Sequence, residues 1–223
     1  MLARNANHKT QIRWMKFYRH ILRPDPRKYD IACGYLDGES VYYVVDKINA
    51  KKKYGWNQND YRNIGFDPKL DVPYFQKLDG VITLTPECES ILKEAFPQFA
   101  GKMHQIPPLV SQSYIQSCAA AYSPTEYASA SGYKLISVGR LVPQKGFDIA
   151  ITASKILKDL GIGFRWYIIG DGALRGELQR QIAEQSLTDC VFLLGENNNP
   201  YPYIQQADVF VLPSLRETSG NVL

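Results

Sequence analysis

Two cations in the stretch "SVGRLVPQKGFD", residues 137–148, have the type and spacing to bind a diphosphate. Arg140 and Lys145 are five positions apart on a loop that follows an apolar strand and leads into a helix. Gly139 permits a turn where the strand ends. Two flexible cations there could clamp a diphosphate and neutralise the charge that grows as it leaves. Taken alone, however, an arginine and a lysine on a loop are more often simply solvated, so both interpretations stay open.

A carboxylate and a small-residue loop follow later, in "ADVFVLPSLRETSGNVL", residues 207–223. Glu217 comes after an apolar strand and could accept hydrogen bonds from sugar hydroxyls. The backbone amides of Ser219 and Gly220 could meet phosphate oxygens, because the first amides of a helix have no partner within it. Glu217 could equally be an acidic residue that stabilises a helix N-terminus.

Glycines mark the remaining loops of this half of the chain. The stretch "GDGALRG" contains Gly170 and Gly172 and partly resembles a dinucleotide-binding fingerprint, although that fingerprint belongs in the first turn of its domain. The alternative is a tight turn in which Asp171 satisfies amides at the start of a helix. Gly195 opens a third loop, "GENNNPY", and could also approach a ligand through its backbone.

Alternating strands and helices must position these loops. We expect strands at residues 134–141, 164–170, 190–195 and 208–214, separated by helices at 148–161, 173–185 and 200–207. This pattern predicts a Rossmann-like parallel sheet, and ligands of such sheets bind beyond the carboxyl ends of the strands. Each loop described above follows one of these strands, so the sequence predicts that the loops share one edge.

The first half of the chain shows the same alternation. It predicts strands at residues 29–36, 51–56, 80–85 and 103–110, with helices at 39–50, 72–78 and 86–96. We expect a second parallel sheet, covered on both faces. Residues 111–133 are rich in Ser, Ala and Tyr without a clear period, which predicts a linker between domains at 1–110 and 134–223.

The charge is concentrated at the front of the chain. Residues 1–28 hold eight Lys or Arg and one Asp, a net charge of +7, whereas the whole chain of 223 residues has +4. Residues 10–22 predict a basic amphipathic helix that ends before Pro24 and Pro26. It could contact an anionic membrane surface or a phosphorylated acceptor, or it could be a surface helix packed on its domain.

Composition narrows the classes of protein. No stretch of eighteen apolar residues is present, and the first residues lack the apolar core of a signal peptide. We therefore expect a cytoplasmic protein. The basic helix could bring it into peripheral contact with the inner face of the cell membrane. The four cysteines form no C-x-x-C pair, which indicates neither zinc site nor disulfide framework. We expect no metal site and no nucleic-acid partner.

Taken together, the motifs resemble the donor-binding domain of retaining GT-B glycosyltransferases of family 4. The motifs occur in the family's order: "SVGRLVPQKGFD", "IIGDGALRGEL", "VFLLGE", "ADVFVLPS" and "ETSGNV". Upstream, "KKKYGWNQNDY" and "LDGVITLTPECESILKEAFP" look like the last part of the acceptor-binding domain. The resemblance implies an α/β protein of GT-B type with two Rossmann-like domains, both incomplete in an internal piece of a longer protein.

The resemblance also implies roles for the residues. Arg140 and Lys145 would bind the diphosphate of a UDP-, GDP- or ADP-sugar, and Glu217 would be the first acid of an E-x7-E signature that touches the donor sugar. Gly139, Gly170, Gly172, Gly195, Ser219 and Gly220 would line the donor through their backbones. The sugar would pass to a glycan or lipid-linked acceptor with retained configuration, and the leaving diphosphate itself would take the acceptor proton. No cofactor or metal is implied.

The chain departs from the family in three places. Gln58 stands in "WNQNDY" where the family usually has His, and Pro108 stands where many members have Asn. The second acid of E-x7-E would fall two positions beyond Leu223. Two alternatives therefore stay open: a truncated, inactive fragment that binds nucleotide sugar, and a dinucleotide-dependent dehydrogenase suggested by "GDGALRG".

Overall fold

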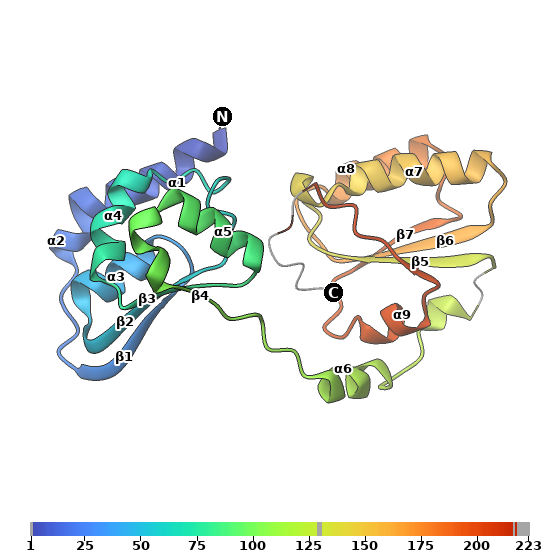
Figure 1. Ribbon diagram of the computed structural model, residues 1–223. Coiled ribbons are helices and arrows are strands. Elements are labelled where there is room, and N and C mark those ends of the chain that lie inside the picture. The colour runs from blue at the N-terminus through green and yellow to red at the C-terminus, as the bar shows by residue number, and fades with distance from the viewer. Residues whose placement is uncertain (1, 129–130, 216, 218–223) are drawn as a thin grey trace. The chain divides into compact units, whose positions relative to one another are not determined.

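The computed structural model describes residues 2–128, 131–215 and 217, and it divides the chain into two units between Leu109 and Val110. Each unit contains a four-stranded parallel sheet (Figure 1). We describe each unit by itself.

The first unit has its strands in chain order, so neighbours in the sequence are neighbours in the sheet. They are β1 (Lys28–Tyr35), β2 (Asn49–Asn57), β3 (Gly80–Thr83) and β4 (Met103–Gln105). The connecting helices are α3 (Glu39–Lys47), α4 (Pro68–Lys77) and α5 (Pro86–Ala95), followed by a 3-10 helix (Pro97–Lys102). Asp67 and Thr85 cap α4 and α5, because their side chains accept hydrogen bonds from Lys69 N (3.0 Å) and Cys88 N (3.1 Å).

The helices of the first unit lie on one side of its sheet (Figure 1). Right-handed crossovers that always step in the same direction along a sheet place every helix on the same face. On the other face, the side chains of Ile31 and Tyr35 in β1 are exposed. The expectation of a sheet covered on both faces is therefore wrong for the described part of this unit.

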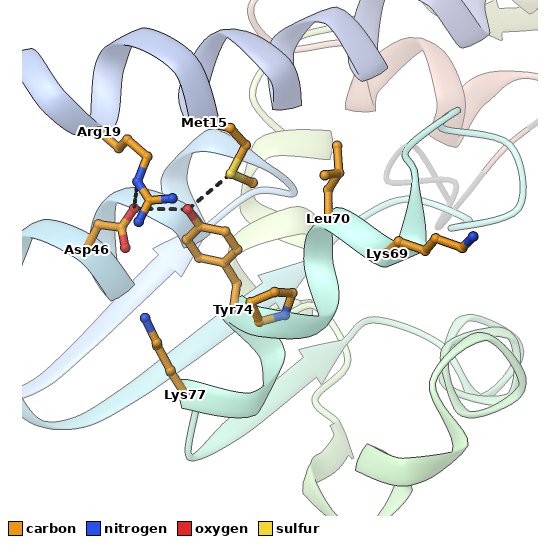
Figure 2. Close-up of a pocket in the computed structure, with 8 residues that line it drawn as sticks. Met15, Arg19, Asp46, Lys69, Leu70, Tyr74 and Lys77 are labelled. Carbon is orange, nitrogen blue, oxygen red and sulfur yellow. Dashed lines mark hydrogen bonds and ion pairs between the residues drawn. The ribbon is translucent and has the colours of Figure 1, made fainter.

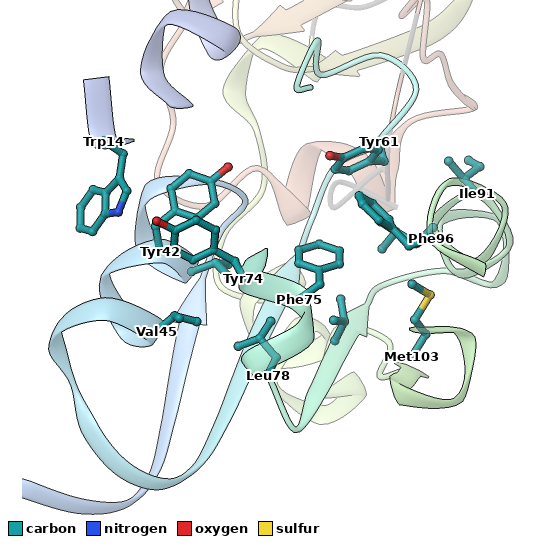
Figure 3. Packing of buried hydrophobic residues seen from close by; sticks show 13 residues of the cluster. Trp14, Tyr42, Val45, Tyr61, Tyr74, Phe75, Leu78, Ile91, Phe96 and Met103 are labelled. Atoms are coloured by element: carbon teal, nitrogen blue, oxygen red, sulfur yellow. The ribbon is translucent and has the colours of Figure 1, made fainter. Parts of the chain in front are cut away.

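A long N-terminal helix completes the first unit's core. It runs through α1 (Leu2–Arg13), a π-helical turn (Trp14–Tyr18) and α2 (Arg19–Ile21), and ends before Pro24 as predicted. Its inner side is anchored by Trp14, whose Nε1 donates to Asp46 (3.0 Å), and by Gln11, which donates to the buried carboxylate of Asp71 (3.0 Å). Figure 3 shows Trp14 beside the aromatic cluster that these helices bury. Its outer side carries the exposed cations.

The second unit changes direction within its sheet. Its strands are β5 (Tyr133–Val138), β6 (Phe164–Ile169), β7 (Val191–Gly195) and β8 (Val209–Phe210), in the order β7-β6-β5-β8. Helices α7 (Phe147–Asp159) and α8 (Arg175–Glu184) connect steps in one direction, and α9 (Tyr201–Gln206) connects the step back across the sheet. The same right-handed rule now places α9 on the opposite face, as Figure 1 shows. This sheet is covered on both faces.

The side chains of β6 alternate between the two covered faces of this sheet. Trp166 and Ile168 belong to the cluster under α7 and α8, whereas Tyr167 and Ile169 belong to a cluster with Tyr203 of α9. Because side chains alternate along a strand, each face of a doubly covered sheet receives every second apolar residue. Two separate apolar layers therefore hold the strand, so its carboxyl end is rigidly placed.

The segment predicted as a linker belongs to the second unit. It forms α6 (Gln112–Ala119) and a 3-10 turn (Thr125–Tyr127). Its tyrosines tie it to the body of the unit, since the hydroxyl of Tyr127 donates to Tyr203 O (3.0 Å) and that of Tyr122 to Asn199 O (2.7 Å). The Tyr-rich composition thus reflects packing and hydrogen bonding within a domain, not a spacer.

Candidate functional site

The loops that follow the four strands of the second unit are joined to one another. Leu141 N donates to Asp171 O (2.9 Å), and Leu174 N donates back to Leu141 O (3.0 Å). Leu215 N donates to Gln144 O (2.9 Å), which fastens the loop after β8 to the loop after β5. The carboxyl edge of this sheet is therefore one continuous surface of hydrogen-bonded loops, as the sequence predicted for a ligand site.

Glycine is required where these loops meet. Gly170 has φ +139°, and a Cβ on it would lie 2.0 Å from Gly139 O; Gly146 has φ +64°, and its Cβ would lie 2.3 Å from Pro213 O. Neither position can hold a side chain without moving the neighbouring backbone. The glycines thus have a demonstrable packing role, and contact between a ligand and Gly139, Gly170, Gly172 or Gly195 stays a prediction.

Lys145 and Glu217 are 72 positions apart and form an ion pair. Lys145 lies in a 3-10 turn (Pro143–Lys145), and only 15% of its side chain is exposed. Glu217 also accepts a hydrogen bond from Ser214 Oγ (2.6 Å). Burial alone would raise the pKa of Glu217, but the hydrogen bonds from Lys145 and Ser214 outweigh it and lower that pKa. The carboxylate is therefore charged at neutral pH.

Arg140 differs from Lys145 in its surroundings. It is exposed, and its side chain makes no hydrogen bond or ion pair with any other described residue. The loop after β5 thus presents one guanidinium that has no partner among the described residues and one ammonium that is held by a carboxylate. A diphosphate would gain two cations here, and the carboxylate beside them could accept hydrogen bonds from sugar hydroxyls.

Comparison with known proteins finds a family that matches this part of the chain. Residues 126–223 match the family described as glycosyl transferases group 1.

The match covers less than half of the chain.

The curated relatives of this chain match different parts of it. It is 41% identical over 91 residues to the amylovoran biosynthesis glycosyltransferase AmsK of Erwinia amylovora, covering 40% of this chain and 22% of the relative. It is 28% identical over 157 residues to an uncharacterized glycosyltransferase, MJ1059, of Methanocaldococcus jannaschii, covering 69% of this chain and 39% of that one. The chain therefore spans less than half the length of these two relatives.

Solved structures show the same fold. TarM matches with a TM-score of 0.60 at 20% identity, covering 87% of this chain and 38% of TarM. HepE of Anabaena, in complex with UDP and glucose, matches with a TM-score of 0.61 at 15% identity, covering 85% of this chain and 54% of HepE. These neighbours are GT-B glycosyltransferases, which confirms the predicted fold class.

The sequence analysis did not identify Arg175, a further cation at this edge of the sheet. Arg175 donates to Asp171 Oδ2 (3.3 Å) and to Leu193 O (3.3 Å), and so bridges the loop after β6 to the last part of β7. The spacing of four residues between Asp171 and Arg175 was the available signal. Asp171 itself accepts from Gly172 N (2.7 Å) and does not cap α8, whose N-cap residue is Leu174. Ser219 and Gly220 lie outside the described residues, and their role stays a prediction.

Two of the departures from the family, Gln58 and Pro108, lie in the first unit and have different surroundings. Gln58 N donates to Asp37 Oδ2 (3.3 Å), and Asn59 Nδ2 donates to the same oxygen (2.7 Å). Burial raises the pKa of Asp37 to about 6, although these two hydrogen bonds favour its ionised form. Pro108 lies in an exposed segment at the end of the first unit. The backbone amide of Gln58 therefore helps to fix the carboxylate of Asp37, just after β1, and this contact does not depend on the Gln58 side chain.

A small pocket of about 130 Å³ lies between the N-terminal helix and α4 in the first unit (Figure 2). Its floor includes Tyr74, whose hydroxyl donates to Asp46 (3.0 Å), and burial raises the pKa of Tyr74 to about 12. Arg19 pairs loosely with the same carboxylate (3.9 Å), and Lys69 and Lys77 line the wall formed by α4. None of the residues predicted to bind the donor lines this pocket.

Proposed function

We propose that the whole protein is a retaining glycosyltransferase of family 4 that moves a hexose from a nucleotide-diphosphate donor to an acceptor hydroxyl. The observation that carries the proposal is the ion pair between Lys145 and Glu217, on the same loop as the exposed guanidinium of Arg140. All three side chains lie on loops at the carboxyl edge of a Rossmann-like sheet, where ligands of such sheets bind. They also lie in the segment that matches the family.

The proposed chemistry needs no protein nucleophile. The bond from the anomeric carbon to the diphosphate oxygen breaks, a bond to the acceptor oxygen forms on the same face, and the acceptor proton passes to the leaving diphosphate. Arg140 and Lys145 stabilise the negative charge that grows on the diphosphate, while Glu217 holds sugar hydroxyls. We propose that these two cations supply the charge that a metal supplies in other transferases.

The names of relatives support the class of acceptor. The chain is 35% identical over 97 residues to a putative colanic acid biosynthesis glycosyltransferase of Escherichia coli. It is 38% identical over 89 residues to a Campylobacter jejuni transferase whose name specifies a diphospho-undecaprenol-linked acceptor. We therefore propose a glycan or lipid-linked acceptor and a UDP-, GDP- or ADP-sugar donor in a cytoplasmic protein.

The test compares the affinities of the chain itself for different nucleotides. Calorimetric titration with UDP, GDP, ADP and NAD is expected to show that one diphosphate binds at least about tenfold more tightly than NAD, a difference of 1.4 kcal/mol. The matching nucleotide sugar is then expected to release its nucleotide when an acceptor glycan is added. Preference for NAD would favour the dehydrogenase alternative, and diphosphate binding without release would favour an inactive binding fragment.

We also propose that the N-terminal helix contacts an anionic membrane surface. Phe17 and Ile21 are 58% and 69% exposed, and they lie among the cations Arg13, Lys16 and Arg23. Exposed apolar side chains within a basic helix are the combination that binds the interface of an anionic bilayer. No helix in the described part of the chain is long and apolar enough to cross a membrane.

Vesicle sedimentation tests this contact. Phe17→Ser with Ile21→Ser is expected to abolish most binding to phosphatidylglycerol vesicles, and wild-type binding is expected to weaken as salt rises. The matched control is Ile156→Ser with Leu160→Ser, because those residues are 57% and 69% exposed in the second unit. Equal loss in both double variants, or equal binding to phosphatidylcholine vesicles, would contradict membrane contact through this helix.

A further inference from the structure

The N-terminal helix holds the segment between β2 and α4, residues 58–67. All residues of this segment are described, and none of them lies in a helix or a strand. Asn7 Nδ2 donates to Ile64 O (2.6 Å), and Gln11 Nε2 donates to Asp67 O (3.2 Å). Asp67 N donates back to Gln11 Oε1 (2.7 Å). Two side chains of the helix therefore fix the backbone of the segment at two places.

A buried carboxylate extends this contact to Tyr61. Gln11 Nε2 also donates to Asp71 Oδ1 (3.0 Å), and the hydroxyl of Tyr61 donates to Asp71 Oδ2. Tyr42 of α3 donates to the same carboxylate, and Figure 3 shows both tyrosines in the aromatic cluster. Gln11, Asp71 and Tyr61 are 0%, 2% and 5% exposed. Because a buried carboxylate is costly unless its donors are in place, the helix and the segment belong to one hydrogen-bonded network.

The other end of the segment reaches the carboxyl edge of the sheet. Gln58 N and Asn59 Nδ2 donate to Asp37 Oδ2, just after β1. Ligands of parallel sheets bind at this edge. A segment without regular structure loses conformational entropy when it is fixed, so the contacts that fix it decide how ordered it is. The N-terminal helix thus controls the order of a segment that reaches the binding edge.

The two sides of the helix have separate contacts. Gln11 and Trp14 on the inner side are buried, whereas Phe17 and Ile21 are exposed. A surface can therefore bind the outer side while the inner side stays docked on the unit. A contact that holds the docked helix shifts the equilibrium away from states in which the helix has lifted off.

We propose that the N-terminal helix is a clamp for residues 58–67 and that it transmits contact on its outer side to them. When the helix lifts from the unit, Asn7 and Gln11 leave the segment and its order is lost. When a surface holds the helix down, the segment stays fixed at the carboxyl edge. The transmission rests on the proposed contact with an anionic membrane, whereas the clamp rests on the hydrogen bonds alone.

Hydrogen exchange followed by mass spectrometry tests the clamp, with the amides of the inner strand β3 as the internal reference. Gln11→Leu removes the buried contacts of the helix to the segment, so the amides of residues 61–67 are expected to exchange at least about tenfold faster. Asn7→Ala removes a second contact at an exposed position, where the change does not endanger folding. It is expected to speed the same amides by a smaller factor.

Trp14→Phe separates a clamp from local support of the segment. Trp14 Nε1 donates to Asp46 of α3 (3.0 Å), and this side chain makes no hydrogen bond with residues 58–67 in the described structure. The variant loosens the helix without touching the segment. A clamp predicts faster exchange at residues 61–67, whereas local support by Gln11 predicts no change.

The matched control is Lys102→Met, at the other end of the first unit's chain. Lys102 Nζ donates to Gln76 O (2.9 Å) and Leu78 O (2.7 Å), so the variant removes two hydrogen bonds that involve neither the helix nor the segment. It is expected to leave the exchange of residues 61–67 unchanged relative to that of β3.

Phosphatidylglycerol vesicles test the transmission. They are expected to slow exchange at residues 61–67 in the wild type, and phosphatidylcholine vesicles are expected to have no effect. Gln11→Leu keeps Phe17 and Ile21, so it is expected to bind the vesicles as the wild type does, but without slower exchange at these residues.

Separate results would overturn the two parts of the inference. Equal exchange at residues 61–67 in Gln11→Leu and Lys102→Met, or unchanged exchange in Trp14→Phe, would reject the clamp. Vesicle binding that leaves this exchange unchanged or speeds it would reject the transmission. Absence of vesicle binding would reject the proposed membrane contact and the transmission with it, while the variants would still decide whether the helix is a clamp.

Discussion

Replacing Arg140 and Lys145 together by alanine is expected to lower the rate of sugar transfer by about 100-fold or more. The diphosphate gains negative charge as the bond to the sugar breaks, and these are the two cations that the loop after β5 presents. Donors fixed at the position where charge develops contribute more to the transition state than to substrate binding. The rate of transfer should therefore fall more than the affinity for the donor.

The measurement combines nucleotide release with calorimetric titration of the nucleotide that the wild-type chain prefers. The control replaces Lys155 and Lys158, two cations of α7 that pair with Asp159 and Asp189. This control removes the same charge from the same unit and is expected to change the rate little, because exposed pairs contribute little. Equal rates in the wild type and the Arg140/Lys145 variant would reject the diphosphate clamp.

Glu217→Gln separates the two parts of the donor. Glu217 occupies one hydrogen-bonding direction of Lys145 and reduces its positive field. Without that charge, Lys145 should hold UDP, GDP or ADP at least as tightly as before. The nucleotide sugar should bind more weakly, since the carboxylate no longer accepts from its hydroxyls. A parallel loss of affinity for both ligands would contradict the role of Glu217 in sugar binding.

Local sequence patterns were sufficient for the elements and for the edge where the loops gather. Alternation along β6 places Trp166 and Tyr167 on opposite faces, and the helices around that strand bury both. Arg140, Lys145 and Glu217 were identifiable because each lies on a loop that follows an apolar strand. Parallel strands bring such positions to one edge whatever their distance in the sequence.

Contacts between distant residues were not predictable in the same way. The pairing of Lys145 with Glu217 depends on where the loop after β8 meets the loop after β5, which is set by the hydrogen bond from Leu215 N to Gln144 O. No periodicity encodes that meeting. The bare face of the first sheet was missed for a similar reason, because strand order decides which face a helix covers and Ile31 and Tyr35 look like core residues.

Gly146→Ala is expected to lower the stability of the protein strongly, because the change falls where two of the donor loops meet. The residue adopts φ +64°, and a Cβ would lie 2.3 Å from Pro213 O. An alanine there adds about 1–2 kcal/mol for the left-handed conformation and must also force apart two loops. We expect a total loss of about 3–4 kcal/mol in the free energy of unfolding. Nucleotide binding should weaken too, because Lys145 lies next to Gly146 and Ser214 lies next to Pro213, so both side chains would move when the two loops are forced apart.

Two further glycines separate these contributions. Gly161 also has a positive φ (+71°), but a Cβ on it would meet no atom within 4 Å, so Gly161→Ala reports the cost of the conformation alone. Gly176 lies in α8 with no positive φ and open space around it, and Gly176→Ala is expected to stabilise by about 0.5–1 kcal/mol. Urea denaturation should therefore rank Gly176→Ala above the wild type, then Gly161→Ala, then Gly146→Ala. If Gly146→Ala lost no more stability than Gly161→Ala, the loops would be free to separate and could not hold Lys145 against Glu217 before the donor binds.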